Sequence, residues 1–188
     1  MIPFWDHCRR MYIGQVLQNR QDSTSVPAII SDTMKTGRDA VYVLERMRAL
    51  CSRREYCVSD ILKKASDSLG GDKAEAARIV AKLVDEKYID DFRYASAYAR
   101  DKSSISGWGP SKIRYMLAGK GIARDVISRA MEEIDSGKAE NRLEKLIENK
   151  YRSLKDDPQC RMKLLRFVLG RGYSYDDAIP LIDRFIRG

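Results

Sequence analysis

The sequence predicts an all-α protein made of three tandem three-helix repeats, which we expect to form an elongated, curved array. The first observation is an internal repeat at an offset of 51 residues, which aligns two sets: Lys112, Leu117, Gly119, Lys120 and Gly121 with Lys163, Val168, Gly170, Arg171 and Gly172. The second is that apolar residues recur at spacings of three and four, which places them on one face of a helix. The third is the scarcity of proline, since only Pro110 lies between Asp39 and Asp157.

Residues 1–36 form a leader that we expect to be disordered or loosely attached, because it holds two of the five prolines and little helical periodicity. Met34 is itself a plausible translation start.

Residues 37–89 form the first and most divergent repeat. Its expected helices carry three apolar stripes: Ala40, Val43, Leu44, Met47 and Cys51; Val58, Ile61, Leu62 and Ala65; and Ala76, Val80, Leu83 and Val84. Asp72, with Glu75 three positions on, fits the N-cap of the third helix.

Residues 90–137 form the second repeat. Its expected helices carry three further apolar sets: Phe92, Ala95 and Ala99; Ile113, Met116 and Leu117; and Val126, Ile127, Ala130, Met131 and Ile134. Pro110 suits the first position of the middle helix, and we expect Gly137 to end the last helix as its C-cap. Asp90 and Asp91 precede the first helix, where capping explains them without catalysis.

Residues 138–188 form the third repeat. Its apolar sets are Leu143, Leu146, Ile147 and Leu154; Leu164, Leu165, Val168 and Leu169; and Leu181, Ile182, Phe185 and Ile186. Pro158 separates the first two helices. Pro180 lies only about a turn into the last helix, where a proline is tolerated.

Positive charge is unevenly distributed along the chain. The formal net charge of +8 and the pI near 9.3 favour a polyanion or an acidic protein surface as partner. Residues 37–93 are nearly balanced, with twelve basic and eleven acidic side chains. Residues 100–124 hold six basic side chains against one acidic, and residues 142–171 hold nine against four. The positive field is therefore expected on the second and third repeats.

The chain lacks the residues that several classes of enzyme need. The single histidine, His7, lies in the leader, so a catalytic triad or a histidine-based metal site has nothing to build on. No phosphate-binding loop of the Gly-x-x-x-x-Gly-Lys-Ser/Thr type occurs, which argues against nucleotide hydrolysis. We therefore expect no enzymatic activity, no metal, no cofactor and no small-molecule substrate.

The spacing of the cysteines and the hydropathy of the chain indicate in which cellular compartment the protein is expected. Cys8, Cys51, Cys57 and Cys160 are too irregularly spaced for a Cys-x-x-Cys motif, and scattered thiols are usually free in a reducing compartment. No apolar run approaches the roughly 20 residues that span a bilayer, and the start of the chain lacks the features of a secretory signal. We expect a cytoplasmic protein that is a monomer and does not enter a membrane.

Two basic glycine turns, at residues 119–121 and 170–172, are the candidate anion-binding features. Each can be a helix C-cap with a cation near the negative end of the helix dipole, which explains one basic residue but not the surrounding cluster. An anion-facing surface is therefore favoured, with salt-sensitive binding because phosphate contacts release counterions. Trp108 and Tyr115 either stack on bases or, as is more common, pack into the seams between repeats.

Three stretches of the sequence carry a resemblance to a known family. They run from Tyr88 to Ala95 (YIDDFRYA), from Gly107 to Leu117 (GWGPSKIRYML) and from Lys120 to Ile122 (KGI). Together they closely resemble the middle repeat of the RecX family, whose members regulate the RecA recombinase. The resemblance extends from about Thr36 to Gly188; it is weaker in the third repeat and absent from the leader.

The resemblance implies tandem three-helix repeats in a curved molecule that lies in the groove of the RecA filament on single-stranded DNA. It implies a regulator without a catalytic site, which inhibits the ATPase, strand-exchange and co-protease activities of RecA. Such a protein acts in recombination, DNA repair and the SOS response. The implied partners are the RecA filament and the single-stranded DNA within it.

Basic side chains are the expected contact and DNA-binding residues. Four of them match the family's middle motif: Arg93, Lys112, Arg114 and Lys120. Three others are their neighbours in the basic second repeat: Arg100, Lys102 and Arg124. The internal repeat adds a second tier: Lys163, Arg166 and Arg171.

A helix, a glycine turn and a helix also describe helix-turn-helix DNA readers, so a transcription regulator is the alternative interpretation. Its expected recognition helix, residues 125–135, argues against this, because it carries four acidic side chains against Arg129 alone. A metal-dependent nuclease is the third interpretation. The carboxylate pairs Asp90-Asp91 and Asp156-Asp157 are too few for such a site, which needs several convergent carboxylates.

Overall fold

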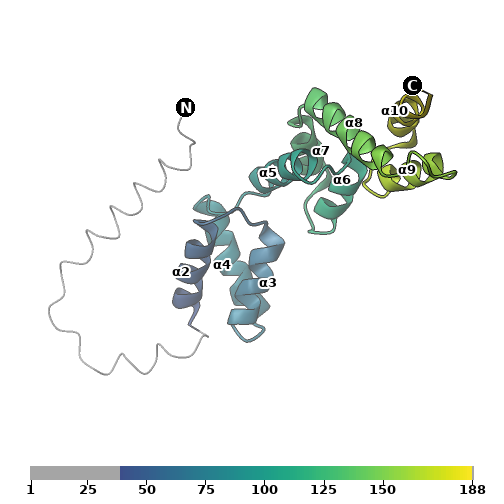
Figure 1. Cartoon of the computed structure of the whole chain (residues 1–188). Helices are drawn as coiled ribbons and strands as arrows, with labels where there is room; N and C mark the ends of the chain where they lie inside the picture. The colour runs from purple at the N-terminus through teal and green to yellow at the C-terminus, as the bar shows by residue number, and fades with distance from the viewer. Residues whose placement is uncertain (1–38, 188) are drawn as a thin grey trace, which may run out of the picture. The chain divides into compact units, whose positions relative to one another are not determined.

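The computed structural model describes residues 39–187, and within them every regular element is an α-helix (Figure 1). The helices form three groups in chain order: α2 (Ala40–Cys51), α3 (Val58–Ser68) and α4 (Lys73–Asp85); α5 (Asp91–Ser104), α6 (Pro110–Ala118) and α7 (Arg124–Glu132); and α8 (Ser136–Arg152), α9 (Cys160–Leu169) and α10 (Tyr175–Arg187). The all-α class and the tandem three-helix units are therefore confirmed. The expected leader, with His7 and Cys8, lies outside the described residues, and the curvature of the array stays a prediction.

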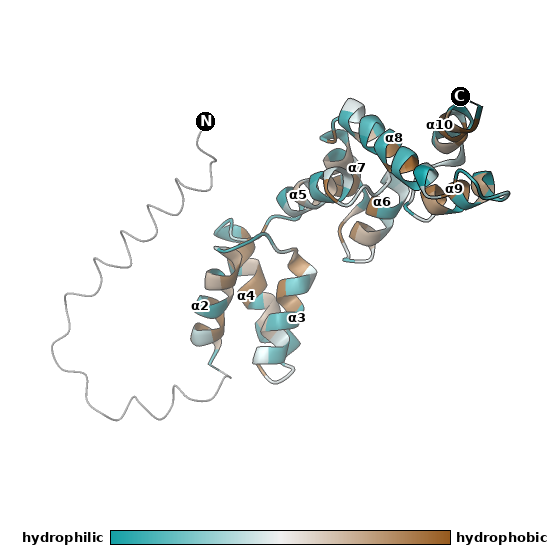
Figure 2. Ribbon diagram, viewed as in Figure 1, coloured by the Kyte–Doolittle hydropathy of each residue, from teal (hydrophilic) through white to brown (hydrophobic). Residues whose placement is uncertain are grey.

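Each group of helices has a hydrophobic core of its own. Met47, Ile61 and Leu83 are among the fully buried side chains of the first core. Ile113 and Leu117 are fully buried in the second, and the third is built around these residues: Ile147, Leu164, Val168 and Ile182. Along the helices hydrophobic and hydrophilic stretches alternate, as expected when a helix buries one face (Figure 2).

Five residues predicted for the core lie at its edge, with 36–41% of their surface exposed. They are Leu62, Val84, Met116, Leu169 and Ile186. Each is the chain neighbour of a more deeply buried apolar residue, and one step along a helix turns the side chain by about 100°. In the other direction, Ile79 of α4 is 4% exposed although the predicted stripe omits it.

The helix ends follow side-chain capping. The carboxylate of Asp72 accepts a hydrogen bond from the N–H of Glu75 at 2.9 Å, as predicted. Pro110 occupies the first turn of α6, also as predicted. The prediction for Gly137 is wrong: it lies in the first turn of α8, because Asp135 accepts from the N–H of Lys138 at 3.0 Å and starts that helix.

Three of the cysteines lie in the described part of the chain, and all three are free, as predicted, and buried: Cys51, Cys57 and Cys160. Burial raises the pKa of the Cys51 thiol to about 11. Between residues 39 and 187, no helix has both the length and the hydrophobicity required to cross a bilayer.

Candidate polyanion-binding interface

The two basic turns have the same local geometry. The turn 119–121 follows α6 and the turn 170–172 follows α9, and in each the first glycine caps the helix. The last glycines have positive φ, +76° in Gly121 and +87° in Gly172, a conformation that side chains with a Cβ rarely adopt. Each turn packs against the start of the middle helix of the preceding repeat. We call the contact of the turn 119–121 with α3 the first joint, and that of the turn 170–172 with α6 the second joint.

An ion pair closes the first joint. The ammonium of Lys120 lies 2.8 Å and 3.0 Å from the two carboxylate oxygens of Asp60. The Ser59 hydroxyl donates to the Lys120 carbonyl at 2.6 Å, and the Lys120 ammonium lies 5.6 Å from the ring centre of Tyr94. Lys120 is therefore engaged within the chain, where it ties the second repeat to the first.

Both ends of this ion pair have shifted pKa values. Partial burial opposes the charge of Lys120, but the hydrogen bond with Asp60 and the attraction of Tyr94 and Asp60 outweigh it, so the pKa of Lys120 is raised. Burial also opposes the charge of Asp60, but its hydrogen bonds with Lys120 and Cys57 lower its pKa. Both shifts favour the charged pair.

The neighbouring carboxylates Asp90 and Asp91 serve different helices. Asp90 caps its own helix α5 by accepting from the N–H groups of Phe92 and Arg93, at 2.8 Å and 3.0 Å. Asp91 instead accepts from the N–H of Val58 at 2.9 Å and so caps α3 of the first repeat. Sequence reasoning predicted capping for both, but no local signal indicates a helix that starts 33 residues earlier.

Backbone contacts close the second joint. The N–H groups of Gly109 and Ser111 donate to the carbonyls of Arg171 and Gly172, at 2.8 Å and 3.1 Å. The chains approach so closely that a Cβ on Gly172 would lie 2.3 Å from that of Lys112. Glycine is therefore required at position 172 both for its backbone angle and for space.

Arg171 adds side-chain contacts to the second joint. Its guanidinium donates to the Ser106 carbonyl at 2.8 Å and lies 4.7 Å from the ring centre of Phe167. Like Lys120 in the first joint, Arg171 is engaged in holding two repeats together.

Two lysines flank Trp108 near the second joint. The ammonium groups of Lys102 and Lys112 lie 5.0 Å and 4.6 Å from ring centres of the indole. The Tyr98 ring meets Trp108 edge-on, with 6.4 Å between centroids. Trp108 thus packs into the fold, whereas the side chain of Tyr115 on α6 is 77% exposed.

Arg93 is a further link between the first two repeats. Its Nε lies 2.6 Å from Glu55, and its guanidinium donates to the carbonyls of Lys87 and Tyr88 where the chain leaves α4, at 3.2–3.3 Å. The side chain nevertheless remains 44% exposed.

The other predicted contact residues have a partner within their own repeat or no ion pair. Arg100 lies 3.7 Å from Glu133 and is 59% exposed, and Lys163 pairs with Asp157. Among the predicted contact residues, three exposed arginines have no ion pair and no side-chain hydrogen bond within residues 39–187: Arg114, Arg124 and Arg166. These three cations are available to a partner.

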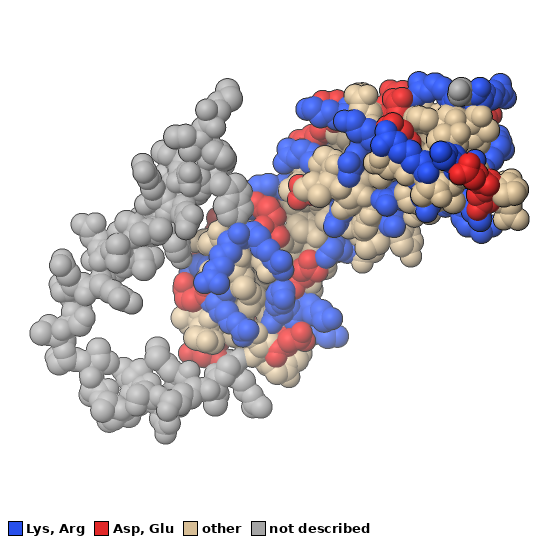
Figure 3. Space-filling view, viewed as in Figure 1, with Lys and Arg blue, Asp and Glu red and all other residues tan. Residues whose placement is uncertain are grey.

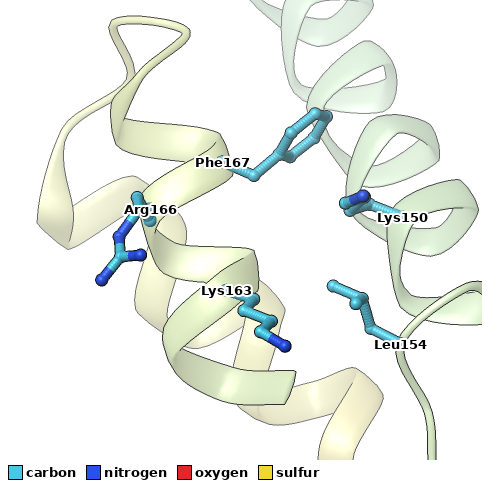
Figure 4. A pocket seen from close by; sticks show the side chains of 5 residues that line it. All are labelled: Lys150, Leu154, Lys163, Arg166 and Phe167. Carbon is cyan, nitrogen blue, oxygen red and sulfur yellow. The ribbon is translucent and has the colours of Figure 1, made fainter. Parts of the chain in front are cut away.

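A hollow of about 290 Å³ lies between α8 and α9 (Figure 4). Its lining residues are Lys150, Leu154, Lys163, Arg166 and Phe167. Phe167 and Lys163 point toward α8, and Arg166 extends away from it (Figure 4). Sequence reasoning missed Lys150 and Phe167. A signal existed for Lys150, since it follows buried Ile147 by three positions, as Lys102 follows buried Ala99.

Basic side chains are not confined to one repeat. Figure 3 shows lysine and arginine over the first group of helices as well as over the third, with carboxylates interspersed. Counted over whole repeats, the net charge is +2 for residues 37–89, +1 for residues 90–137 and +4 for residues 138–188. The excess of positive charge predicted from the sequence therefore belongs to the stretches 100–124 and 142–171, and carboxylates elsewhere in the second repeat offset it.

Comparison with protein families gives two matches within the chain. "RecX, second three-helix domain" matches residues 90–131, and "RecX, third three-helix domain" matches residues 139–178. These matches fall on the second and third groups of helices.

Curated relatives carry the name "Regulatory protein RecX". The protein of Clostridium perfringens (strain 13 / Type A) is 30% identical over 166 residues, which cover 78% of this chain and 77% of that protein. The protein of Clostridium tetani (strain Massachusetts / E88) is 29% identical over 123 residues, or 63% of this chain. The match spans only 56% of the C. tetani protein, which is less than two thirds of its length.

Solved structures share the fold. A crystal structure of a regulatory protein RecX matches with a TM-score of 0.69 and covers 89% of this chain and 83% of that one. The structure of RecX from Lactobacillus salivarius matches with a TM-score of 0.68 and covers 78% and 96%. Both are 22% identical in sequence, so they show a common fold.

Proposed function

We propose that this chain, which belongs to the RecX family of regulatory proteins, binds the RecA recombinase filament on single-stranded DNA and inhibits it. The activities that it lowers are ATP hydrolysis, strand exchange and co-protease activity. The observation that carries the proposal is that three predicted contact arginines in the basic stretches 100–124 and 142–171 are exposed and have no ion pair or side-chain hydrogen bond within residues 39–187: Arg114, Arg124 and Arg166.

A filament suits this arrangement because it offers acidic protein surface and DNA phosphates together. Repeats joined in series present weak contacts one after another, and several weak contacts on one chain add avidity. In this proposal the predicted cations that form no ion pair or guanidinium contact between repeats bind the filament: Arg100, Lys102, Lys112, Arg114, Arg124, Lys163 and Arg166. Arg93, Lys120 and Arg171 hold neighbouring repeats together.

Inhibition follows if the bound chain occupies the filament groove and blocks the entry of duplex DNA. It also follows if the chain binds an inactive state of the protomers more tightly than the active state, since a ligand shifts an equilibrium only through such a difference. The chain itself makes and breaks no bond in this mechanism. It acts in the cytoplasm as a monomer without a cofactor, as part of recombination, DNA repair and the SOS response.

The test titrates the full chain into a RecA ATPase assay on single-stranded DNA and, separately, screens duplexes for a preferred sequence. We expect inhibition well below one chain per RecA protomer and no preference among duplexes. A sharp preference for one duplex sequence, with RecA unaffected, would contradict the proposal and favour a transcription regulator.

A further inference from the structure

The two joints have equivalent positions but opposite charge balance. Aligning the starts of α3 and α6 places Asp60 opposite Lys112, and aligning the turns places Lys120 opposite Arg171. In the first joint a carboxylate meets an ammonium at 2.8 Å. In the second joint a lysine stands where the carboxylate would be, so two positive residues occupy the positions of an ion pair.

Lys102 adds a third positive charge to the second joint. Its ammonium and that of Lys112 each lie about 5 Å from the indole of Trp108, so the two nitrogens are within about 10 Å of each other. Like charges at this separation repel each other when no counter-charge is near.

Within residues 39–187, no carboxylate forms an ion pair with Lys102, Lys112 or Arg171. The charged groups of Lys112 and Arg171 instead meet backbone carbonyls, and the Lys102 ammonium lies over the rings of Tyr98 and Trp108. Lys112 reaches the Gly170 carbonyl at 3.4 Å, and Arg171 reaches that of Ser106 at 2.8 Å. Carbonyl dipoles carry partial charges, so they offset only part of three full positive charges. The second joint therefore carries an excess of positive charge, which a bound anion would neutralise.

We propose that the second joint binds a phosphate group, which Lys102 and Lys112 hold through charge-assisted hydrogen bonds. For the source of the phosphate this inference rests on the proposed function: it is a phosphodiester of the single-stranded DNA. The bound phosphate neutralises the cations of the second joint, as the Asp60 carboxylate neutralises Lys120 in the first. It therefore stabilises the contact between the second and third repeats.

The neighbouring side chain favours a nucleic acid over an acidic peptide. Tyr115 lies three residues after Lys112 on α6, and residues at this spacing are neighbours on a helix surface. The Tyr115 side chain is 77% exposed, whereas lysines flank Trp108. An uncovered ring beside a phosphate site matches one nucleotide, because a base can stack on the ring while its phosphate meets the lysines.

The first experiment compares Lys112→Gln with Lys145→Gln in the full chain. Lys145 is an exposed lysine of α8 that has no ion pair within residues 39–187, so both variants remove one charge. Binding of a fluorescent oligo-dT is measured by anisotropy at several salt concentrations. We expect Lys112→Gln to weaken binding about fivefold and to lower the salt slope by about 0.7, the value for one phosphate contact on a single strand. Lys145→Gln should keep the wild-type slope, and equal slopes in the two variants would overturn the site.

The second experiment rebuilds the charge pair of the first joint with Lys112→Asp. Thermal unfolding is followed in inorganic phosphate and in chloride at equal ionic strength. We expect phosphate to raise the Tm of the wild type and to leave that of Lys112→Asp unchanged. A phosphate-dependent rise that persists in Lys112→Asp would overturn the site. A wild type that responds to oligo-dT alone supports the site and identifies the polymer as the ligand.

A third measurement separates this inference from an acidic-protein site and from the proposed function. If Lys112→Gln loses binding to poly-glutamate but not to oligo-dT, the joint faces acidic protein and the phosphate site is overturned. If the wild type inhibits RecA while Lys112→Gln binds oligo-dT normally, the site fails and the proposed function stands. If the slope difference is present but RecA is unaffected, the site stands and the proposed function fails.

Discussion

Asp60 decides what the first basic turn does. Its carboxylate binds the Lys120 ammonium, and each keeps the other charged, with the pKa of Asp60 lowered and that of Lys120 raised. The side chains are 34% and 28% exposed, so solvent screens the pair and its contribution to stability is modest. Lys120, which was expected to bind an external anion, already forms an ion pair with the Asp60 carboxylate.

We predict that Asp60→Asn lowers the free energy of unfolding by about 0.5–1 kcal/mol at pH 7. Because the folded pKa of Asp60 lies below the usual 3.8, the pair stabilises the fold above that value and loses its effect as the pH falls through the folded pKa. Urea unfolding at pH 7 and at pH values approaching 3 measures both effects. Asp156→Asn, which changes an exposed carboxylate without an ion pair in the described chain, is the control. An Asp60→Asn deficit that is equally large at low pH would contradict this role.

Trp108 and Tyr115 separate packing from binding. We predict that Trp108→Ala lowers the free energy of unfolding by about 2 kcal/mol, because a half-buried indole and its contacts with Lys102, Lys112 and Tyr98 are lost. Tyr115→Ala should change it by less than about 0.5 kcal/mol, since the ring is exposed. Tyr115→Ala should instead weaken oligo-dT binding by about 1–3 kcal/mol.

Denaturant unfolding measures the stability of the Trp108→Ala and Tyr115→Ala variants, and anisotropy on the same preparations measures their oligo-dT binding. A marked loss of stability in Tyr115→Ala would refute the assignment of Tyr115 to the surface.

At the scale of the elements, the glycines of the basic turns are not equivalent. Gly121 and Gly172 share a positive φ, but a Cβ meets nothing within 4 Å at Gly121 and lies 2.3 Å from the Lys112 Cβ at Gly172. A residue with a Cβ would therefore be strained in its backbone at both positions, but would clash sterically only at Gly172.

We predict that Gly121→Ala costs about 1 kcal/mol of stability, the usual cost of a left-handed residue with a Cβ. Gly172→Ala should cost at least about 2 kcal/mol more, because the turn must withdraw from α6. The Tm values of the two variants and the wild type test this order. Equal Tm values for the two variants would mean that the close approach in the second joint contributes nothing to stability.

The helices were predictable from the sequence because their signals are local. Apolar spacing indicated the helices between residues 39 and 187, and Asp72 and Pro110 marked helix starts correctly. Leu154, which was predicted on the first helix of the third repeat, lies two residues beyond its end at Arg152. Gly137 was misread because the nearby Asp135 competes with it and starts a helix. The edge residues, such as Met116 beside Leu117, show that spacing identifies a stripe but not its boundary.

The contacts between repeats were not predictable, because they join residues far apart in the chain. Lys120 and Asp60 are 60 positions apart, and Arg171 and Ser106 are 65 apart. Local reasoning found the basic residues of both turns but could not tell that the fold uses their charged groups. The candidate site was therefore predicted in composition, while the division between structural and outward-facing cations required the structure.

At the scale of the whole molecule, the fold joins three small cores in series, so each repeat depends on the contacts at its ends. The first joint supplies its own counter-charge, and the second leaves positive charges without a carboxylate. Together with the exposed arginines, this gives a chain of repeats whose net positive charge a polyanion can offset.

The most direct measurement of the central claim is RecA ATPase inhibition by a variant that reverses the charge of three predicted contact arginines, each of which has no ion pair or side-chain hydrogen bond within residues 39–187: Arg114→Glu, Arg124→Glu and Arg166→Glu. Exposed substitutions cost little stability, and complementary charge governs docking. We predict that the triple variant unfolds near the wild-type Tm and that half-maximal inhibition requires at least about ten times more protein. Lys145→Glu should inhibit like the wild type. A folded triple variant that inhibits RecA as strongly as the wild type would contradict the claim that these outward cations bind the filament.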